Sequence, residues 1–260
     1  MCGRLGGVYL DLTAEVLGSV LASAFTAFNA ALKPGQVKPS RKWLDDIASR
    51  KQKNVEKMTA RLNAETSPMI FSNALRAVRD AIAERPDVYI VNEGANTLDF
   101  GRNIIDMFQP RHRLDSGTWG VMGIGMGYAI AAAVETGKPV VALEGDSAFG
   151  FSGMEIETIC RYDLPVVTVT FNNNGIYRGD QGDGAPSPTG FKRDARYDKI
   201  IEAFGGQGYH VTDTAGLQKA VSDAVASGKP ALINAVIDSA AGTESGHIAS
   251  LNPKSALAAT

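Results

Sequence analysis

The chain has 260 residues, of which 44% are hydrophobic and 21% are charged, and its formal net charge is −2. This length and apolar content allow one sizeable core, or one domain with an appendage. The near balance of charge gives no reason to expect a nucleic-acid partner. The N-terminus lacks a basic-then-apolar signal, and the longest apolar run, residues 121–134, is shorter than the roughly 20 residues that a membrane span needs. We therefore expect a soluble, cytoplasmic protein.

Residues 1–64 are predicted to form a helical appendage, a linker or remnant of upstream domains, before the main domain. The stretch from Lys33 to Arg61 is basic, with nine Lys or Arg residues against three acids. A solvated helix or linker explains this run. Contact with an anionic ligand, such as a phosphate of coenzyme A, is the alternative. The sequence leaves both interpretations open.

From about residue 67 the pattern changes to alternating strands and helices. Ser67 is expected to cap a helix that has Pro68 at its first position and ends near Glu84. A Gly-rich loop is expected to enter a small-residue helix within residues 117–135. Further strands are predicted at 88–91, 139–143, 165–171, near 209 and at 231–237, and further helices at 152–161, 197–204 and 215–226. This alternation predicts a doubly wound, mostly parallel α/β sheet in a domain of residues 65–260.

Polar residues directly follow two consecutive strands of this sheet. Asp146 follows one strand, and Asn173 follows the next strand, 27 residues later. Each segment alone is typical of a helix cap or a turn. Because the carboxyl ends of parallel strands meet at one edge, we expect the two side chains to lie side by side. Mg²⁺ prefers six oxygen ligands, and Asp146, Asn173 and the Gly175 carbonyl offer three, leaving room for two diphosphate oxygens and a water. The helix expected to begin near Ser152 would direct its N-terminus at the same anion.

The string from Gly145 to Ser147, together with that from Asn172 to Gly175, matches the diphosphate-and-magnesium signature of thiamine-diphosphate enzymes, with Ser147 in place of the usual glycine. The longer string EGDSAFGFSGMEIETICRYDLPVVTVTFNNNGIYRGD resembles the branch of oxalyl-CoA decarboxylases and 2-hydroxyacyl-CoA lyases. The tail AAGTESGHIASLNPK, residues 240–254, resembles bacterial oxalyl-CoA decarboxylases in particular. The resemblance covers roughly residues 41–260.

The resemblance assigns roles to individual residues. It implies that the loop with Ala95 and Asn96 contacts the diphosphate and that Met122 supports the bent middle of the cofactor. It also implies that Tyr177 faces the reaction centre and that Ser245 lies on a C-terminal lid, both as catalytic residues. Without it, Met122 reads as ordinary core and residues 94–97 as a plain turn. The implied cofactor-binding set is Ala95, Asn96, Met122, Gly145, Asp146, Ser147, Asn173, Gly175, Ile176 and Tyr177, with Asp146, Asn173 and Gly175 as metal ligands.

The chemistry implied by the resemblance is the decarboxylation of oxalyl-CoA to formyl-CoA and CO₂, with thiamine diphosphate as the electron sink and Mg²⁺ as its anchor. In such enzymes a glutamate of a separate pyrimidine-binding domain activates the cofactor. Only residues 3–17 resemble the end of that domain, so we expect the chain to be truncated and inactive alone. A homo-oligomer or a partner that supplies the domain is therefore implied. The alternatives are a 2-hydroxyacyl-CoA lyase and a non-catalytic cofactor-binding subunit.

A dinucleotide-binding protein is the alternative from another class. The glycines at 123, 125 and 127, with Glu144 about twenty residues further on, superficially match a nucleotide fingerprint. Two features count against this interpretation. Residues 111–115 read as too polar for the strand that should precede the fingerprint, and Tyr128 stands where its third glycine belongs.

Overall fold

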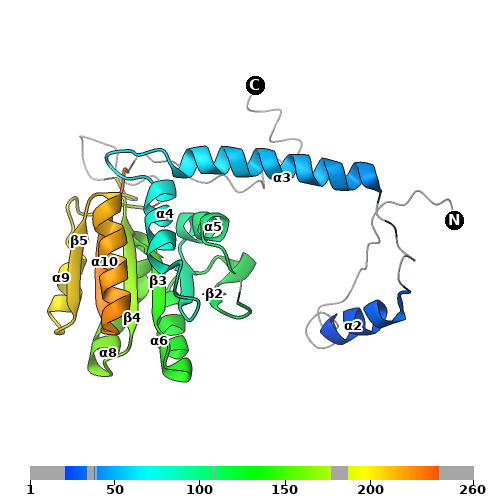
Figure 1. Cartoon of the computed structure of the whole chain (residues 1–260). Helices are drawn as coiled ribbons and strands as arrows, with labels where there is room; N and C mark the ends of the chain where they lie inside the picture. Colours follow the sequence, from blue (N-terminus) through cyan, green and yellow to red (C-terminus); the bar gives the residue numbers. More distant parts are fainter. Residues whose placement is uncertain (1–20, 34–37, 39, 108, 177–186, 240–260) are drawn as a thin grey trace. The chain divides into compact units, whose positions relative to one another are not determined.

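The structure is a computed structural model that describes residues 21–33, 38, 40–107, 109–176 and 187–239. The chain divides into two compact units, residues 1–57 and 58–260. Helix α2 (Leu21–Ala31) lies in the first unit, and helix α3 (Arg41–Leu62) runs from the first into the second (Figure 1). The Lys and Arg side chains of α3 are exposed, so they are accessible to solvent or to an anionic ligand. Within the described ranges, no helix combines the length and the apolar character that crossing a bilayer requires.

The second unit is built on a six-stranded sheet in which every pair of neighbouring strands is parallel. The strand order is β2-β1-β3-β4-β6-β5. The strands are β1 (Tyr89–Glu93), β2 (Arg113–Asp115), β3 (Val140–Gly145), β4 (Val166–Asn172), β5 (Gln207–Val211) and β6 (Ala231–Val236). The predicted doubly wound α/β fold is confirmed.

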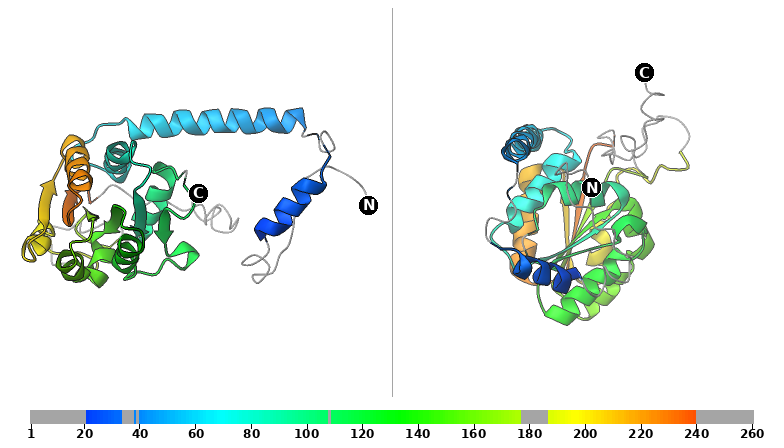
Figure 2. Two further views of the ribbon diagram at one scale, coloured as in Figure 1. Left: turned by 60° about the horizontal axis from the view of Figure 1, so that its bottom comes forward. Right: turned by 90° about the vertical axis from the view of Figure 1, so that its right-hand side faces the viewer.

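Helices cover both faces of the sheet (Figures 1 and 2). Alternate residues of one strand face opposite layers: Val141 and Leu143 of β3 join one core cluster, and Val140 and Ala142 join the other. Burial on both faces explains why this strand is a continuous apolar run. The first cluster includes residues of α4 (Phe71–Ile82), α5 (Ala95–Ile104) and α10 (Thr214–Ser227), and the second those of α6 (Gly125–Thr136), α7 (Asp146–Ser152), α8 (Glu155–Arg161) and α9 (Asp198–Glu202).

The start of the first helix of this unit differs from the prediction. Helix α4 begins at Phe71 and not at Pro68, and the Ser67–Pro68 peptide bond is cis. Met69 forms a bridge with Ile237 beside the sheet, so its backbone is extended. The side chain of Asn73 accepts a hydrogen bond of 2.8 Å from the backbone N–H of Ile70 and so caps the helix. The Ser-Pro pair resembled a helix start, but pairing with a distant strand held the next residues out of the helix.

Two further elements differ from the prediction. The helix expected over 152–161 is present as α8, which begins three residues later, at Glu155, and an unpredicted helix, α7, precedes it, beginning at Asp146 immediately after β3. Gly150 lowers the local helix propensity, so little in the sequence indicated α7. The polar segment 111–115 contains the short strand β2. It lies at the sheet edge and is half-buried, so backbone pairing with β1 sustains it without an apolar face.

Candidate functional site

The predicted oxygen ligands lie at the carboxyl ends of β3 and β4. These strands are hydrogen-bonded neighbours, and Gly145 pairs in register with Phe171. Asp146 and Asn173 are therefore brought to the same edge of the sheet, where both are buried, with 3% and 5% of their surface exposed. The backbone N–H of Gly175 donates to Oδ2 of Asp146 over 3.0 Å. The structure thus brings together the three residues that the sequence predicted as sources of metal ligands, and all three line one cavity.

Two opposing effects act on the pKa of the Asp146 carboxylate. Burial raises the pKa of Asp146 to about 6, while hydrogen bonds from backbone N–H groups, including those of Gly175 and Ser147, act to lower it. The Ser147 N–H donates to Oδ1 over 2.7 Å. A buried carboxylate with this pKa is destabilised when charged, and a bound cation would offset that cost. A buried carboxylate with these surroundings is suited to binding a hard divalent ion.

The turn after β4 is fixed by hydrogen bonds on both sides. Asn174 takes a left-handed conformation, with φ of 64°, and its N–H donates to Oδ1 of Asn172 over 3.1 Å. The Ile176 N–H donates to the Thr189 carbonyl over 2.8 Å, and the Asn174 carbonyl accepts a bond of 2.9 Å from Phe191. These bonds use the backbone groups on either side of Gly175. They hold the Gly175 peptide beside Asp146.

A cavity of about 120 Å³ opens at this edge of the sheet. It is smaller than the roughly 300–1,000 Å³ of a pocket that encloses a whole small molecule, so it suits one end of a larger ligand. Nine of the ten predicted cofactor-binding residues line it: Ala95, Asn96, Met122, Gly145, Asp146, Ser147, Asn173, Gly175 and Ile176.

The turn after β1 forms another wall of the cavity. Gly94 has a φ of 97°, a conformation that side chains rarely adopt. A Cβ at this position would lie 3.3 Å from Cβ of Ala148 and 3.5 Å from the backbone nitrogen of Gly145, so the strand ends approach each other closely here. Helix α5 begins at Ala95 and α7 at Asp146, so two helix N-termini lie at the cavity. The N-terminal end of a helix carries a partial positive charge, which favours an anion such as a diphosphate.

Several residues at the site were not among the predicted ones. Phe71 and Phe171 contribute apolar lining to the cavity. Asn172 positions the turn after β4, and the asparagine run was the only signal for it. Glu93 and Glu144 are buried behind the cavity wall, where register places them opposite each other. Burial, followed by the negative charge of Glu93 and a hydrogen bond to it, raises the pKa of Glu144 well above its usual range.

The two predicted catalytic residues, Tyr177 and Ser245, lie outside the described residues. Tyr177 follows Ile176, which lines the cavity.

In the described part of the chain, no group of three or more His, Cys, Asp or Glu side chains is placed to hold a metal. The donor set at Asp146 contains a single carboxylate. That composition suits Mg²⁺, which takes few protein carboxylates together with phosphate oxygens.

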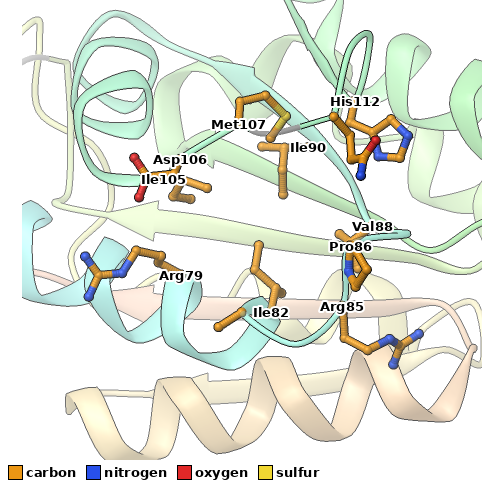
Figure 3. Close-up of a pocket in the computed structure, with 12 residues that line it drawn as sticks. Arg79, Ile82, Arg85, Pro86, Val88, Ile90, Ile105, Asp106, Met107 and His112 are labelled. Atoms are coloured by element: carbon orange, nitrogen blue, oxygen red, sulfur yellow. The ribbon is translucent and has the colours of Figure 1, made fainter.

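A larger cavity, of about 340 Å³, lies at the amino ends of β1 and β2, so it is at the opposite end of the strands from the predicted metal ligands (Figure 3). Its floor is apolar, with Val88 and Ile90 of the first strand region among its lining. The arginines on its wall already have partners, because Arg79 pairs with Asp80 and Arg85 with Asp87. It contains none of the predicted cofactor residues.

The structure also bears on the dinucleotide interpretation. One argument against it was wrong, since a strand, β2, does precede the glycine segment. Glu144, however, is fully buried, so it is not accessible to a ribose hydroxyl. The backbone N–H groups of Gly123 and Gly125 donate to the Glu93 carboxylate. A fingerprint loop would direct such groups at a phosphate.

Comparison with known proteins agrees with this geometry. Residues 94–235 match the family described as thiamine pyrophosphate enzyme, C-terminal TPP binding domain. The chain is 58% identical to the oxalyl-CoA decarboxylase of Escherichia coli (strain K12), over 94% of this chain and 44% of that protein. It is 46% identical to the 2-hydroxyacyl-CoA lyase of Arabidopsis thaliana, over 80% of this chain and 39% of that protein. It therefore spans less than half the length of these relatives.

Among solved structures, the benzoylformate decarboxylase of Polynucleobacter necessarius superposes with a TM-score of 0.55 at 19% identity. The match covers 64% of this chain and 32% of that one, and it supports the fold alone. The family match supports more than the fold, because residues 94–235 include the turn at Gly94 and the polar residues after β3 and β4, which line the cavity. The chain belongs to the thiamine pyrophosphate enzymes, and it carries their C-terminal cofactor-binding domain.

Proposed function

We propose that this chain binds the diphosphate of thiamine diphosphate through Mg²⁺, with the Asp146 carboxylate, the Asn173 side chain and the Gly175 carbonyl as ligands. The observation that carries the proposal is the convergence of these groups on one cavity edge around a buried carboxylate. The N-termini of α5 and α7 complement the phosphate charge. The proposed cofactor domain comprises residues 65–260, with the C-terminal segment as its lid.

The proposed reaction is the decarboxylation of oxalyl-CoA to formyl-CoA and CO₂. When bound, thiamine diphosphate supplies a carbon nucleophile and an electron sink. The contribution of this chain is to fix the diphosphate at the strand ends and to place Met122 against the middle of the cofactor. Tyr177 and Ser245 are proposed to orient the substrate carboxylate or a bound water. The name and the 58% identity of the Escherichia coli relative support this substrate.

A 2-hydroxyacyl-CoA lyase is the second candidate. The plant relatives of that name are 46% identical to this chain. Both reactions use a coenzyme A thioester and the same cofactor chemistry, so the cofactor site does not distinguish them. Incubation of the assembled enzyme with oxalyl-CoA and, separately, with a 2-hydroxyacyl-CoA would do so, with formyl-CoA as the product measured in each case.

Catalysis is proposed to need a second contribution, a pyrimidine-binding domain. Large apolar side chains are exposed at Trp119 and Val121, which flank the cavity-lining Gly120, and at Phe151. Gly123, which follows Met122, packs against Phe151, so this group adjoins the cavity wall. An apolar surface of this kind is typical of a protein interface. We take it as the face that meets a pyrimidine-binding domain, in a homo-oligomer or from a partner, and we propose a cytoplasmic location for the assembly.

Binding of Mg²⁺ and inorganic pyrophosphate tests the cofactor site directly. By isothermal titration calorimetry, we expect D146A to weaken pyrophosphate binding in the presence of Mg²⁺ by about 100-fold, because a ligand of the ion is lost. N173A should weaken it by about 10-fold, since a neutral ligand is lost. The control is D223A on α10, an exposed aspartate paired with Lys219, which should leave the affinity unchanged. Equal binding by wild type and D146A would refute the proposed site.

A further inference from the structure

Two glutamates meet behind the wall of the cofactor cavity. Glu93 is the last residue of β1, Glu144 is next to the last of β3, and the strand register pairs them directly. Their exposed fractions are 1% and 0%. Neither lines the cavity, and neither is needed as a metal ligand in the proposed site. A buried carboxylate requires strong hydrogen-bond partners, so the hydrogen bonds of Glu93 identify what it holds.

Glu93 binds the segment that leads into α6. One carboxylate oxygen accepts a hydrogen bond from the N–H of Gly123 and the other from the N–H of Gly125. These N–H groups lie at the positive end of the helix, which favours a negative partner. A Cβ at Gly125 would overlap carboxylate oxygens of both Glu93 and Glu144, so glycine is required for the approach. The contact is a clamp on two backbone positions.

The clamp lies next to Met122. Gly120 and Met122 line the cofactor cavity, and Gly123 follows directly with a φ of 95°. The other end of the loop is also tied, because the Gly117 N–H donates to Oδ1 of Asp115 over 2.9 Å. The loop therefore has fixed points before and after its cavity-lining residues. Loss of the second fixed point would free Met122 and leave the metal ligands on β3 and β4 in place.

We propose that Glu93 is a positioning residue, whose carboxylate clamps the Gly123 and Gly125 N–H groups and so sets Met122 against the middle of thiamine diphosphate. This role rests on the proposed cofactor site, and it adds a residue that touches neither the cofactor nor the ion. This role predicts that a change at Glu93 affects the two parts of the cofactor differently. Glu93 should affect the binding energy of the thiamine part of the cofactor and not that of the diphosphate part.

The test compares two ligands, Mg²⁺-pyrophosphate and Mg²⁺-thiamine diphosphate, by calorimetry on the full chain. In E93Q the amide offers one acceptor oxygen where the carboxylate offered two, so one backbone N–H loses its partner. We expect thiamine diphosphate to bind about 10-fold more weakly and pyrophosphate to change by less than about twofold. The matched control is E144Q, the same change at the paired position, for which both affinities should stay within about twofold of wild type.

A double-mutant cycle with M122A tests whether Glu93 affects cofactor binding through Met122. If Glu93 acts through Met122, E93Q should have no further effect on thiamine diphosphate binding in the M122A background. An equal loss in both backgrounds would overturn the proposal, as would parallel losses for both ligands or an E144Q effect as large as that of E93Q. Failure of the wild type to bind Mg²⁺-pyrophosphate would instead overturn the proposed function.

Hydrogen exchange needs no ligand, so it tests the contact between Glu93 and the loop even if the wild type does not bind Mg²⁺-pyrophosphate. Amide hydrogen exchange over residues 117–124 should be faster in E93Q than in wild type or E144Q, with exchange in β3 and β4 unchanged. Unchanged exchange over that loop would overturn the clamp. If E93Q does not fold, as judged by circular dichroism, E93D tests the same contact, because its shorter side chain draws the carboxylate away from the Gly123 and Gly125 N–H groups, and unchanged exchange over residues 117–124 in E93D would likewise overturn the clamp.

Discussion

At the scale of single residues, the burial of Asp146 links the stability of the protein to pH and, in the proposed site, to the bound metal ion. In the unfolded chain an aspartate has a pKa of about 3.9, whereas burial raises the pKa of Asp146 in the folded protein to about 6. Between these values the folded state retains a proton that the unfolded state has lost. Ionisation therefore costs the folded, metal-free protein stability as the pH rises through this window, and the full cost is present above pH 6.

We predict that metal-free wild type loses stability relative to D146N between pH 4 and pH 7.5. The expected relative loss is about 3 kcal/mol, from the shift of about two pKa units. Urea unfolding with a chelator present, at both pH values, measures it. D223N, an exposed change on α10, should show no such pH-dependent difference. A stability difference between D146N and wild type that is the same at both pH values would contradict the assigned pKa.

The same shift predicts the pH dependence of metal binding. Mg²⁺ and the proton compete for the Asp146 carboxylate, so affinity for Mg²⁺-pyrophosphate should fall by about tenfold per pH unit below pH 6 and level off above it. Calorimetry between pH 5 and 8, corrected for the titration of pyrophosphate itself, provides the measurement. An affinity that keeps rising steeply from pH 7 to pH 8 after this correction would count against Asp146 as the titrating ligand.

At the scale of elements, the end of β4 is joined to its neighbours by polar side chains. Asn172 donates from Nδ2 to the Ala195 carbonyl and to Oδ1 of Asn234 on β6, over 3.2 Å in each case. Asn234 in turn lies 3.1 Å from Nδ1 of His210 on β5. The strand ends that carry the turn with Asn173 are thus held by a hydrogen-bonded row across three strands.

We predict that N172A disturbs the turn and weakens Mg²⁺-pyrophosphate binding by about 10-fold, because the Asn174 N–H loses its acceptor and Oδ1 of Asn234 loses the donor on Asn172. The matched comparison is N174G. Asn174 has a left-handed backbone that glycine adopts without strain, so N174G should bind within about twofold of wild type. The reverse ranking of the two variants would show that the turn depends on the Asn174 side chain.

The elements differ in how far local sequence could predict them. The buried strands and α10 were predicted closely, because their apolar periodicity follows directly from burial. The start of α4 was wrong because Met69 pairs with Ile237, 168 residues away in the chain. β2 was missed because an edge strand depends on backbone pairing with β1 and needs no apolar alternation. Contacts between distant segments decided each failure.

At the scale of the whole molecule, the exposed aromatic side chains beside the cavity-lining loop are the surface that we predict to contact a partner. Trp119 is 91% exposed and Phe151 is 66% exposed. Large aromatic side chains in such positions commonly dominate the binding energy of an interface. The chain matches 44% of the length of the Escherichia coli relative.

We predict that a polypeptide with the unmatched part of that relative binds this chain, and that the W119S/F151S double variant weakens this binding by about 10-fold or more. Sedimentation velocity measures the association. Y162S is the control, since Tyr162 is also exposed but follows α8 at the opposite edge of the sheet. Both variants should retain wild-type affinity for Mg²⁺-pyrophosphate. Equal binding of the partner by all three proteins would refute the assigned face.

The sequence by itself determined the alternation of strands and helices, the two polar strand ends and the family signature. These features are local, or they depend only on the rule that parallel strands end at one edge. Tertiary structure decided that Asp146 is buried enough to raise its pKa, that Asn172 and Asn234 link β4, β6 and β5, and that Glu93 binds the backbone of the loop after Met122. The physical reason is that burial and hydrogen bonding between segments far apart in the chain depend on how the layers pack, which no local periodicity records.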